Sequence, residues 1–379
     1  SMGGAAGQSG ATGDSGAGGE AGTGASAGAS GAGGAAPHNV LDCTALGAVG
    51  EWQQVAPPDL DIGCDPDAGV CATSASEALV LDPQNAGVIY LGTAQQGIWK
   101  STDCGSSWAV VSTGKNGILL GASILTQLEI DPVDPQVLYT KDDNHEFKSE
   151  NGGVDWEIIW PAGFTQAAGA VNFLVIDPQD HEHLLLALRQ DCTAEFAPSC
   201  IAETFDAGAT WGLLKTPGDG IGRPWFVDTS HWLFSQGGAL WRTSDGGATW
   251  VQLADKSLGG VYGRMYRSPT GGFYLGADLG VVYSADGAVW SVLPNSGEGN
   301  RSGVVGSDTT LFTSHLGYCM KWGTDMMVYY SAPMSTHKPW TAMAAPGMTQ
   351  GAVSMGYDLD HHVLYASACT DGFWRVVTE

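Results

Sequence analysis

The sequence predicts an all-β fold built from a repeated unit of strands. A polar turn motif recurs, a strand ending in Asp-Pro recurs upstream of it, and successive copies are about 40 to 55 residues apart. The motif has four good copies and a shortened fifth: STDCGSSW at Ser101–Trp108, SENGGVDW at Ser149–Trp156, TFDAGATW at Thr204–Trp211, TSDGGATW at Thr243–Trp250 and SADGAVW at Ser284–Trp290.

Each copy lies between two strand-like runs and is expected to be a hairpin connection. Its Asp can accept hydrogen bonds from nearby backbone N–H groups, and its Gly can take a positive φ. Its Trp enters the next strand as a large apolar anchor. We refer to the five copies as box turns.

This pattern resembles the Asp-box, or BNR, repeat S-x-D-x-G-x-T-W of sialidases, sortilin-type receptors, xyloglucan-degrading glycoside hydrolases and photosystem assembly factors. The resemblance implies a β-propeller of four-stranded antiparallel blades in which the box joins the two outer strands of a blade. It implies no particular reaction, because the families that share the repeat have unrelated functions.

The spacing of the repeat sets the number of blades. The box tryptophans are 48, 55, 39 and 40 residues apart, and two further units, Gly303–Trp340 and Ala352–Val377, lack a good box. Residues 50–379 then make seven blades of about 47 residues each, with six blades as the alternative if one weak unit is an insertion. Glu51–Val55 reads like the strand Trp250–Leu253, so it is expected to pair with the last blade and close the ring.

Composition divides the chain into two regions. Residues 1–37 are almost entirely Gly, Ala and Ser and predict a disordered tether, whereas 38–379 predict a single propeller domain. Ser1-Met2 reads as a remnant of expression, so any signal peptide or lipid-attachment cysteine is expected upstream of it. No apolar run approaches the 18 residues of a transmembrane helix.

Charge and cysteines predict an exported protein. A net charge of −25 disfavours nucleic acid or an anionic membrane as a partner. Eight cysteines without a CxxC motif suit an oxidising compartment. We expect a monomer in the bacterial periplasm, at the outer-membrane surface or outside the cell, because the tether and cysteines resemble those of Gram-negative surface lipoproteins. The expected disulfides are Cys64–Cys71, Cys192–Cys200, Cys319–Cys369 and Cys43–Cys104, with buried free thiols as the alternative.

Propeller geometry indicates where a site would lie. The starts of the innermost strands share one end of the ring with the loops joining the second and third strands, and we call this end the site face; the box turns lie near the opposite rim. The substrate-binding candidates on the site face are Arg189, Arg223, Arg264, Arg301, Asn172, Trp225 and Trp322. The catalytic candidates are His145, His315, Tyr318, Asp143 and Asp371.

Three consecutive units place an arginine near the start of the inner strand: Arg223, Arg264 and Arg301. Converging guanidinium groups repel one another unless an anion or carboxylates neutralise them. They therefore predict a clamp for the carboxylate or sulfate of an acidic sugar; in the alternative interpretation each arginine pairs locally with an acid such as Asp228 or Asp278. Trp225 and Trp322 are candidates for stacking against a sugar.

The function predicted is binding, and cleavage, of an acidic saccharide at an axial pocket. A lyase would neutralise a uronate with arginine and use His145, His315 or Tyr318 for proton transfer. A hydrolase would need two carboxylates across the cleft, with Asp143 and Asp371 among the candidates. The alternative is a non-catalytic propeller that recognises a protein or peptide. No cofactor is expected; Asp59–Gly69 has alternating acids like a calcium loop, but it lacks a bidentate Glu and reads equally as a polar turn.

Overall fold

The computed structural model describes most of the chain beyond residue 37. Two units are distinguished, Ser1–Ala35 and Ala36–Glu379, and everything described below belongs to the second. The described residues are 38–61, 64–65, 70–71, 78–125, 127–142, 145–160, 171–188, 192, 195, 199–218, 222–254, 258–296, 299–315, 329–348, 351–368 and 371–379. Among them, no helix is long and apolar enough to cross a membrane.

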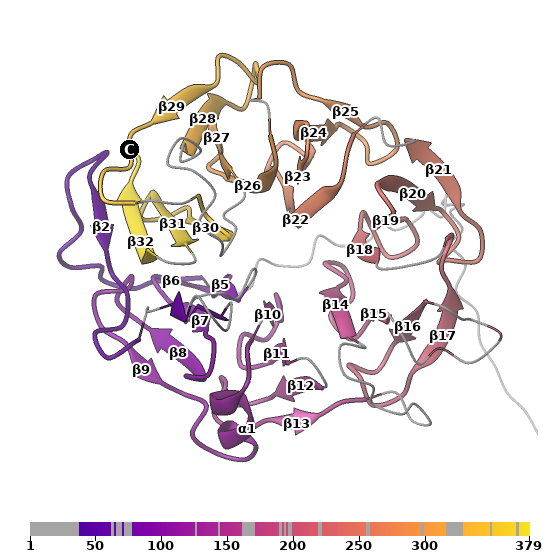
Figure 1. Cartoon of the computed structure of the whole chain (residues 1–379), viewed down its shortest axis with the longest axis horizontal. Coiled ribbons are helices and arrows are strands. Elements are labelled where there is room, and N and C mark those ends of the chain that lie inside the picture. The colour runs from indigo at the N-terminus through magenta and orange to yellow at the C-terminus, as the bar shows by residue number, and fades with distance from the viewer. Residues whose placement is uncertain are drawn as a thin grey trace, which may run out of the picture. The chain divides into compact units, whose positions relative to one another are not determined.

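Seven four-stranded antiparallel sheets surround a central axis (Figure 1). From the innermost strand outward, blades one to three are β5 (Leu79–Leu81), β7 (Ile89–Gly92), β8 (Ile98–Ser101) and β9 (Ala109–Val110); β10 (Gln127–Ile130), β11 (Leu138–Lys141), β12 (Glu146–Ser149) and β13 (Glu157–Ile158); β14 (Val171–Ile176), β15 (Leu184–Leu188), β16 (Cys200–Thr204) and β17 (Gly212–Lys215). Blades four and five are β18 (Gly222–Phe226), β19 (Trp232–Gln236), β20 (Ala239–Thr243) and β21 (Val251–Ala254); β22 (Val261–Arg267), β23 (Phe273–Ala277), β24 (Gly280–Ser284) and β25 (Ser291–Val292).

Blades six and seven complete the ring. They are β26 (Arg301–Gly306), β27 (Thr310–His315), β28 (Tyr329–Pro333) and β29 (Thr341–Met343); β30 (Ser354–Asp358), β31 (Val363–Ala368), β32 (Gly372–Val377) and β2 (Trp52–Gln54). Outside the blades, β1 (Asn39–Val40) pairs with β6 (Asn85–Ala86), β3 (Cys64–Asp65) pairs with β4 (Val70–Cys71), and α1 spans Gly117–Ala122. The predicted seven-bladed all-β propeller is confirmed.

The last blade takes its outer strand from the start of the propeller. In β2, Trp52 and Gln53 lie opposite Val376 and Arg375 of β32. The side chain of Arg375 reinforces this junction: Nε donates to Gln53 Oε1 (3.0 Å), and the other guanidinium nitrogens donate to the carbonyls of Cys104 (2.7 Å) and Ala45 (2.8 Å). The two ends of the ring are therefore joined by backbone pairing and by one buried arginine.

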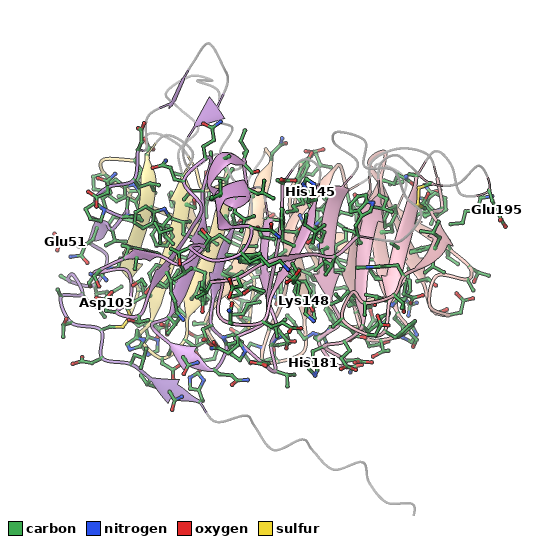
Figure 2. All side chains as sticks on the ribbon, turned by 90° about the horizontal axis from the view of Figure 1, so that it is seen from below. Glu51, Asp103, His145, Lys148, His181 and Glu195 are labelled. Carbon is green, nitrogen blue, oxygen red and sulfur yellow. A yellow bond between two sulfur atoms is a disulfide. The ribbon has the colours of Figure 1, made fainter. Side chains whose placement is uncertain are left out.

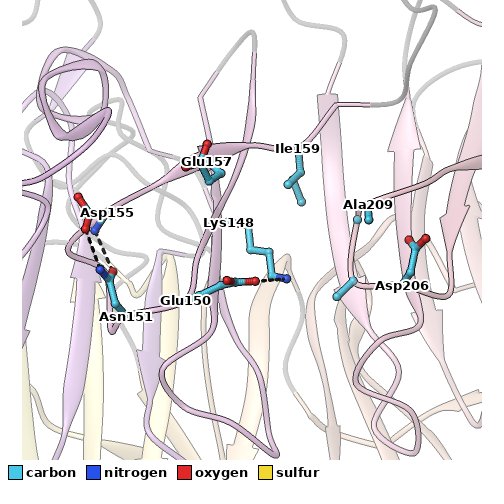
Figure 3. A pocket seen from close by; sticks show the side chains of 10 residues that line it. Lys148, Glu150, Asn151, Asp155, Glu157, Ile159, Asp206 and Ala209 are labelled. Carbon is cyan, nitrogen blue, oxygen red and sulfur yellow. Dashed lines mark hydrogen bonds and ion pairs between the residues drawn. The ribbon is translucent and has the colours of Figure 1, made fainter.

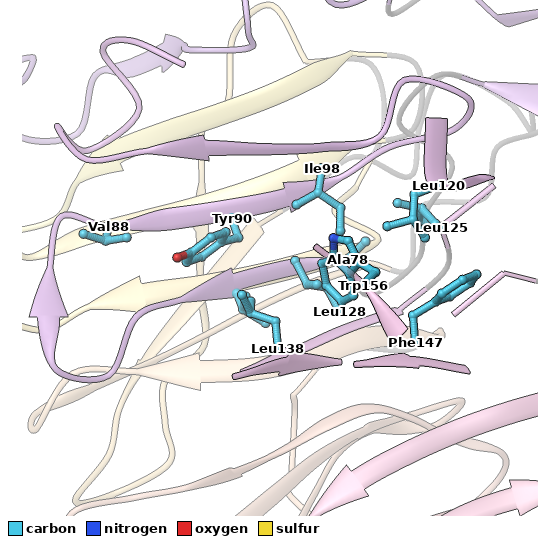
Figure 4. Packing of buried hydrophobic residues seen from close by; sticks show 11 residues of the cluster. Ala78, Val88, Tyr90, Ile98, Leu120, Leu125, Leu128, Leu138, Phe147 and Trp156 are labelled. Carbon is cyan, nitrogen blue, oxygen red and sulfur yellow. The ribbon is translucent and has the colours of Figure 1, made fainter. Parts of the chain in front are cut away.

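The hydrophobic core lies between neighbouring blades. Alternate residues of a strand point to opposite faces of its sheet. Because both faces are covered by a blade here, the second strands are almost entirely buried. All five residues of β15 are buried. Figure 4 shows the core between blades one and two, where Tyr90 and Ile98 of the first pack near Leu138 and Trp156 of the second.

The box turns connect the third and fourth strands of the first five blades, as predicted for the two outer strands. In the third copy, Asp206 Oδ1 accepts hydrogen bonds from the Thr204 hydroxyl (2.7 Å) and the Thr210 backbone N–H (2.7 Å). The Trp211 indole donates to the carbonyl of Gly208 (3.0 Å), whose φ is +95°. Hydrogen bonds from the Thr210 and Thr204 side chains lower the pKa of Asp206 to about 2.

A second set of repeated turns follows the inner strands, at the Asp-Pro sequences noted above. Asp131 Oδ1 accepts the N–H groups of Val133 (2.7 Å) and Asp134 (3.0 Å), and Asp177 Oδ1 accepts that of Gln179 (2.8 Å). His181, which lies 2.7 Å from Asp131, marks this end of the ring in Figure 2, whereas His145 lies toward the other end. The end of the ring that carries His145 is the site face.

Candidate functional site

An axial pocket of about 390 Å³ opens among the starts of the inner strands on the site face. Blades three to seven all contribute to it, which is the convergence that propeller geometry implies. The residues that matter for its chemistry are Phe173, Arg223, Gln236, Tyr262, Gly263 and Ser302. Its volume is within the range of small-molecule sites.

Arg223 is the basic residue that lines this pocket among the described side chains. It is only 5% exposed, and its guanidinium lies over the ring of Phe173, with 4.4 Å from Cζ to the ring centroid. The Trp225 ring lies 5.5 Å away on the same measure. Stacking on aromatic faces fixes the plane of the guanidinium, which suits planar recognition of a carboxylate or sulfate.

Arg264 reaches across the axis instead of lining this pocket. Its strand β22 is irregular between Tyr262 and Tyr266, and Gly263 has a φ of +73°. From this bulge the guanidinium donates to the carbonyl oxygens of Leu79 (2.8 Å) in blade one and Leu128 in blade two, and Nε lies 3.2 Å from Glu129 Oε1. Arg264 therefore ties blade five to blades one and two, beside a second cavity of about 30 Å³.

Arg301 is fully buried beside His315. The two residues are paired across β26 and β27, and the Arg301 guanidinium lies 4.4 Å above the Tyr330 ring centroid. Its three nitrogens make no hydrogen bond of good geometry in the described part of the chain, and the side chain of Tyr330 favours the charged form of Arg301. Burial and the nearby charge of Arg301 lower the pKa of His315 to about 4, so the imidazole is neutral at neutral pH.

The site-face end of blade two holds a separate group of ionisable side chains. His145 Nδ1 lies 3.2 Å from Asp142 Oδ1, which also accepts the His145 backbone N–H (2.6 Å). Glu146 is 1% exposed, and its pKa is raised well above the usual range by burial, which the nearby Lys141 only partly opposes. Burial therefore favours the neutral form of the Glu146 carboxyl, a feature that its sequence context did not signal.

Trp225 is buried in the core and does not lie where a residue that stacks against a sugar would be. It is 3% exposed, belongs to the core between blades four and five, and donates from Nε1 to the carbonyl of Gly263 (3.0 Å). Burial of a large apolar surface with a satisfied indole N–H is the ordinary role of a core tryptophan. Trp225 fixes the bulge of β22 and is not exposed to a ligand.

The remaining candidates are distributed as follows. Asp371 lies in the turn between β31 and β32, where its carbonyl accepts hydrogen bonds from Gln54 (2.8 Å) and Trp374 (2.7 Å). Asn172 lies in β14, and nothing is described of its side chain. Outside the described residues lie Asp143, Arg189, Tyr318 and Trp322.

Two of the expected disulfides are present. Cys43–Cys104 joins the N-terminal segment to the first box turn, and Cys192–Cys200 joins residues on the site-face side of blade three. Cys64 lies opposite Cys71 in the pairing of β3 with β4, but nothing is described of either side chain. Cys319–Cys369 lies outside the described residues.

The described residues offer one group of three potential metal ligands. It consists of Cys43, Cys104 and His361. The two sulfurs are joined in the disulfide, so neither is a thiolate that could ligate a metal ion. The predicted acidic loop Asp59–Gly69 lies largely outside the described residues.

A second pocket, of about 370 Å³, lies away from the axis (Figure 3). It is formed by the box turns and outer strands of blades two and three, and its polar groups are mostly acidic: Glu150, Asp155, Glu157 and Asp206. Its one cation among the lining residues, Lys148, is paired with Glu150 at 2.8 Å. This pocket has the wrong charge for an anion.

Three solved structures illustrate what the fold resembles. A catalytically inactive variant of virginiamycin B lyase from Staphylococcus aureus with quinupristin has a TM-score of 0.59 at 10% identity, over 86% of this chain and 98% of that one. YCF48 from Cyanidioschyzon merolae has a TM-score of 0.52 at 11% identity, over 86% and 97%. An ancestral GH74 enzyme has a TM-score of 0.41 at 17% identity, over 78% of this chain but only 35% of its own length.

These likenesses establish a β-propeller and no function, because their identities are low. No known protein family and no curated protein matches the chain. The propellers of similar structure include a variant of virginiamycin B lyase and YCF48. Function must therefore be argued from the site itself.

Proposed function

We propose that this chain is an exported propeller whose axial pocket binds an acidic saccharide, with Arg223 contacting its carboxylate or sulfate. The observation that carries the proposal is the position of Arg223, which lines a pocket of about 390 Å³ with its guanidinium held over Phe173. In a protein with a net charge of −25, an arginine that lines a pocket is a local feature that favours anionic ligands.

The box turns support assignment of the repeats to the Asp-box type. In each turn, side-chain hydrogen bonds join partners within the turn. In the third copy, Asp206 accepts from the Thr204 hydroxyl and from the backbone N–H and hydroxyl of Thr210. This accounts for their recurrence by structure alone. The two disulfides support an oxidising location, and the tether is proposed to link the propeller to a lipid anchor.

Cleavage of the bound saccharide is the more demanding part of the proposal. His315 is neutral at neutral pH, as a general base must be, but its pKa of about 4 makes it a weak base. His145, beside the Asp142 carboxylate, is the second candidate for proton transfer. A lyase would use one of these imidazoles after an arginine has neutralised the uronate.

A non-catalytic binding protein is the second candidate, and Arg264 favours it. This side chain spans the axis and is committed to two backbone carbonyls and Glu129. A channel crossed by a structural side chain suits a binding module, whereas an enzyme needs a deep pocket that excludes water. In that case the pocket would bind an acidic side chain or terminus of a protein partner.

The test is a screen of uronate-containing, sulfated and neutral polysaccharides for binding and for products, with wild-type protein and Arg223→Met. We expect binding of anionic polymers only, weakened at least tenfold by Arg223→Met. Products that absorb in the ultraviolet identify a lyase, and new reducing ends alone identify a hydrolase. Equal binding of neutral and anionic polymers, or no effect of Arg223→Met, would contradict the proposal.

A further inference from the structure

Tyr262 and Asp278 form a fixed hydrogen-bonded pair at the wall of the axial pocket. Tyr262 lines the pocket, and its hydroxyl donates to Asp278 Oδ1 at 2.7 Å. The other carboxylate oxygen accepts the backbone N–H of Gly260 at 2.5 Å. Tyr262 was not a candidate from the sequence, and Asp278 was considered there only as a local partner of an arginine.

Two glycines are required for this arrangement. Gly259 has a φ of +72°, and a Cβ there would come within 2.5 Å of the Asp278 Cβ. A Cβ on Gly260 would collide with the Tyr262 hydroxyl oxygen. The chain therefore leaves out two side chains at the place where Tyr262 and Asp278 meet, which holds the hydroxyl at one position on the pocket wall.

The direction of the hydrogen bond decides what Tyr262 can do. A tyrosine hydroxyl has one proton and two acceptor lone pairs. With its proton donated to a carboxylate, the oxygen offers acceptor capacity, and the adjacent negative charge repels an anion and favours a donor. Arg223 has the opposite character, because a guanidinium can only donate.

We infer that Tyr262 is a specificity-determining residue: it accepts a hydrogen bond from a hydroxyl group of the ligand while Arg223 binds the ligand's anionic group. The pocket then selects anions that also carry hydroxyl groups, such as uronates, over plain carboxylates. This inference rests on the proposed function of the same pocket. It adds the second contact point that would let the protein discriminate among anions.

The experiment compares two carboxylates of similar size, glucuronate with hydroxyl groups and cyclohexanecarboxylate without them. Dissociation constants are measured by calorimetry or NMR titration for wild-type protein, Tyr262→Phe and Arg223→Met. Tyr283→Phe is the matched control, because Tyr283 lies in the same blade but does not line the pocket. Thermal unfolding checks that each variant is folded.

We expect Tyr262→Phe to weaken glucuronate binding about threefold to tenfold, the range for loss of one hydrogen bond, and to leave cyclohexanecarboxylate binding unchanged. Arg223→Met should weaken both. If Tyr262→Phe affects both ligands equally or neither, the inference is overturned while the function of Arg223 stands. If wild-type protein binds neither carboxylate, the proposed function falls with it.

Discussion

Three arginines at equivalent places in successive blades have three different environments. Arg223 lines the axial pocket over Phe173, Arg264 is bonded to backbone across the axis, and Arg301 is buried over Tyr330. All three lie on inner strands, in β18, β22 and β26. The sequence could not distinguish their environments, because these depend on the bulge in β22 and on which face of its strand each side chain occupies.

The Arg301→Met variant tests whether that buried charge stabilises the protein. A buried cation without well-formed hydrogen bonds is costly, and the interaction with Tyr330 recovers only part of the cost. We expect Arg301→Met to raise the free energy of unfolding by about 1 kcal/mol or more, measured by urea denaturation. NMR titration should also show the pKa of His315 rising from about 4, although burial still keeps it low.

Arg223→Met serves as the comparison at the pocket, where no gain in stability is expected. A lower free energy of unfolding for Arg301→Met, together with an unchanged pKa of His315, would contradict this account. It would mean that the guanidinium has favourable contacts that the described arrangement lacks.

At the scale of elements, the box turn is the feature that sequence predicts best. Its residues interact within eight positions of the chain, so the local sequence determines the hydrogen bonds: Ser or Thr, then Asp, then Gly, then Trp. In the second copy Asn151 takes the place of Asp and accepts the backbone N–H of Asp155 at 2.9 Å. The turn thus needs an acceptor at this position more than it needs a charge.

The Asp206→Ala variant tests that interpretation, with Asp206→Asn as its control. The pKa of Asp206 is lowered to about 2 from an ordinary value of 3.8. A lowered pKa contributes stability that is fully present above pH 3.8 and is lost as the pH falls through about 2. We expect Asp206→Ala to lower the urea midpoint at pH 6 clearly more than Asp206→Asn does, because Asn keeps the acceptor, and we expect the smaller difference between wild type and Asp206→Asn to shrink as the pH falls through about 2.

Equal destabilisation by Asp206→Ala and Asp206→Asn at pH 6 would contradict this interpretation, because it would show that the charge, and not the acceptor, stabilises the turn.

The pocket wall was less predictable than the turn. Tyr262 meets Asp278 only because β22 and β23 pair and two glycines leave room between them. Such a contact depends on register, which periodicity alone does not provide.

At the scale of the whole molecule, the ring brings distant segments together. Repeat length and the resemblance of Glu51–Val55 to a fourth strand were enough to predict seven blades and all-β architecture. The axial pocket was predictable as a place, because inner strands must start at a common end. Its contents were not, since Trp225 turned inward to the core and Arg264 extended across the axis.

The central claim is that the anionic group of a saccharide binds Arg223 in the axial pocket. A crystal structure of the protein with glucuronate bound tests it most directly. The account predicts a carboxylate within hydrogen-bond distance of the Arg223 guanidinium, between Phe173 and Tyr262. The claim would be contradicted if glucuronate bound only at the rim, or if no glucuronate occupied the axial pocket at saturating concentration.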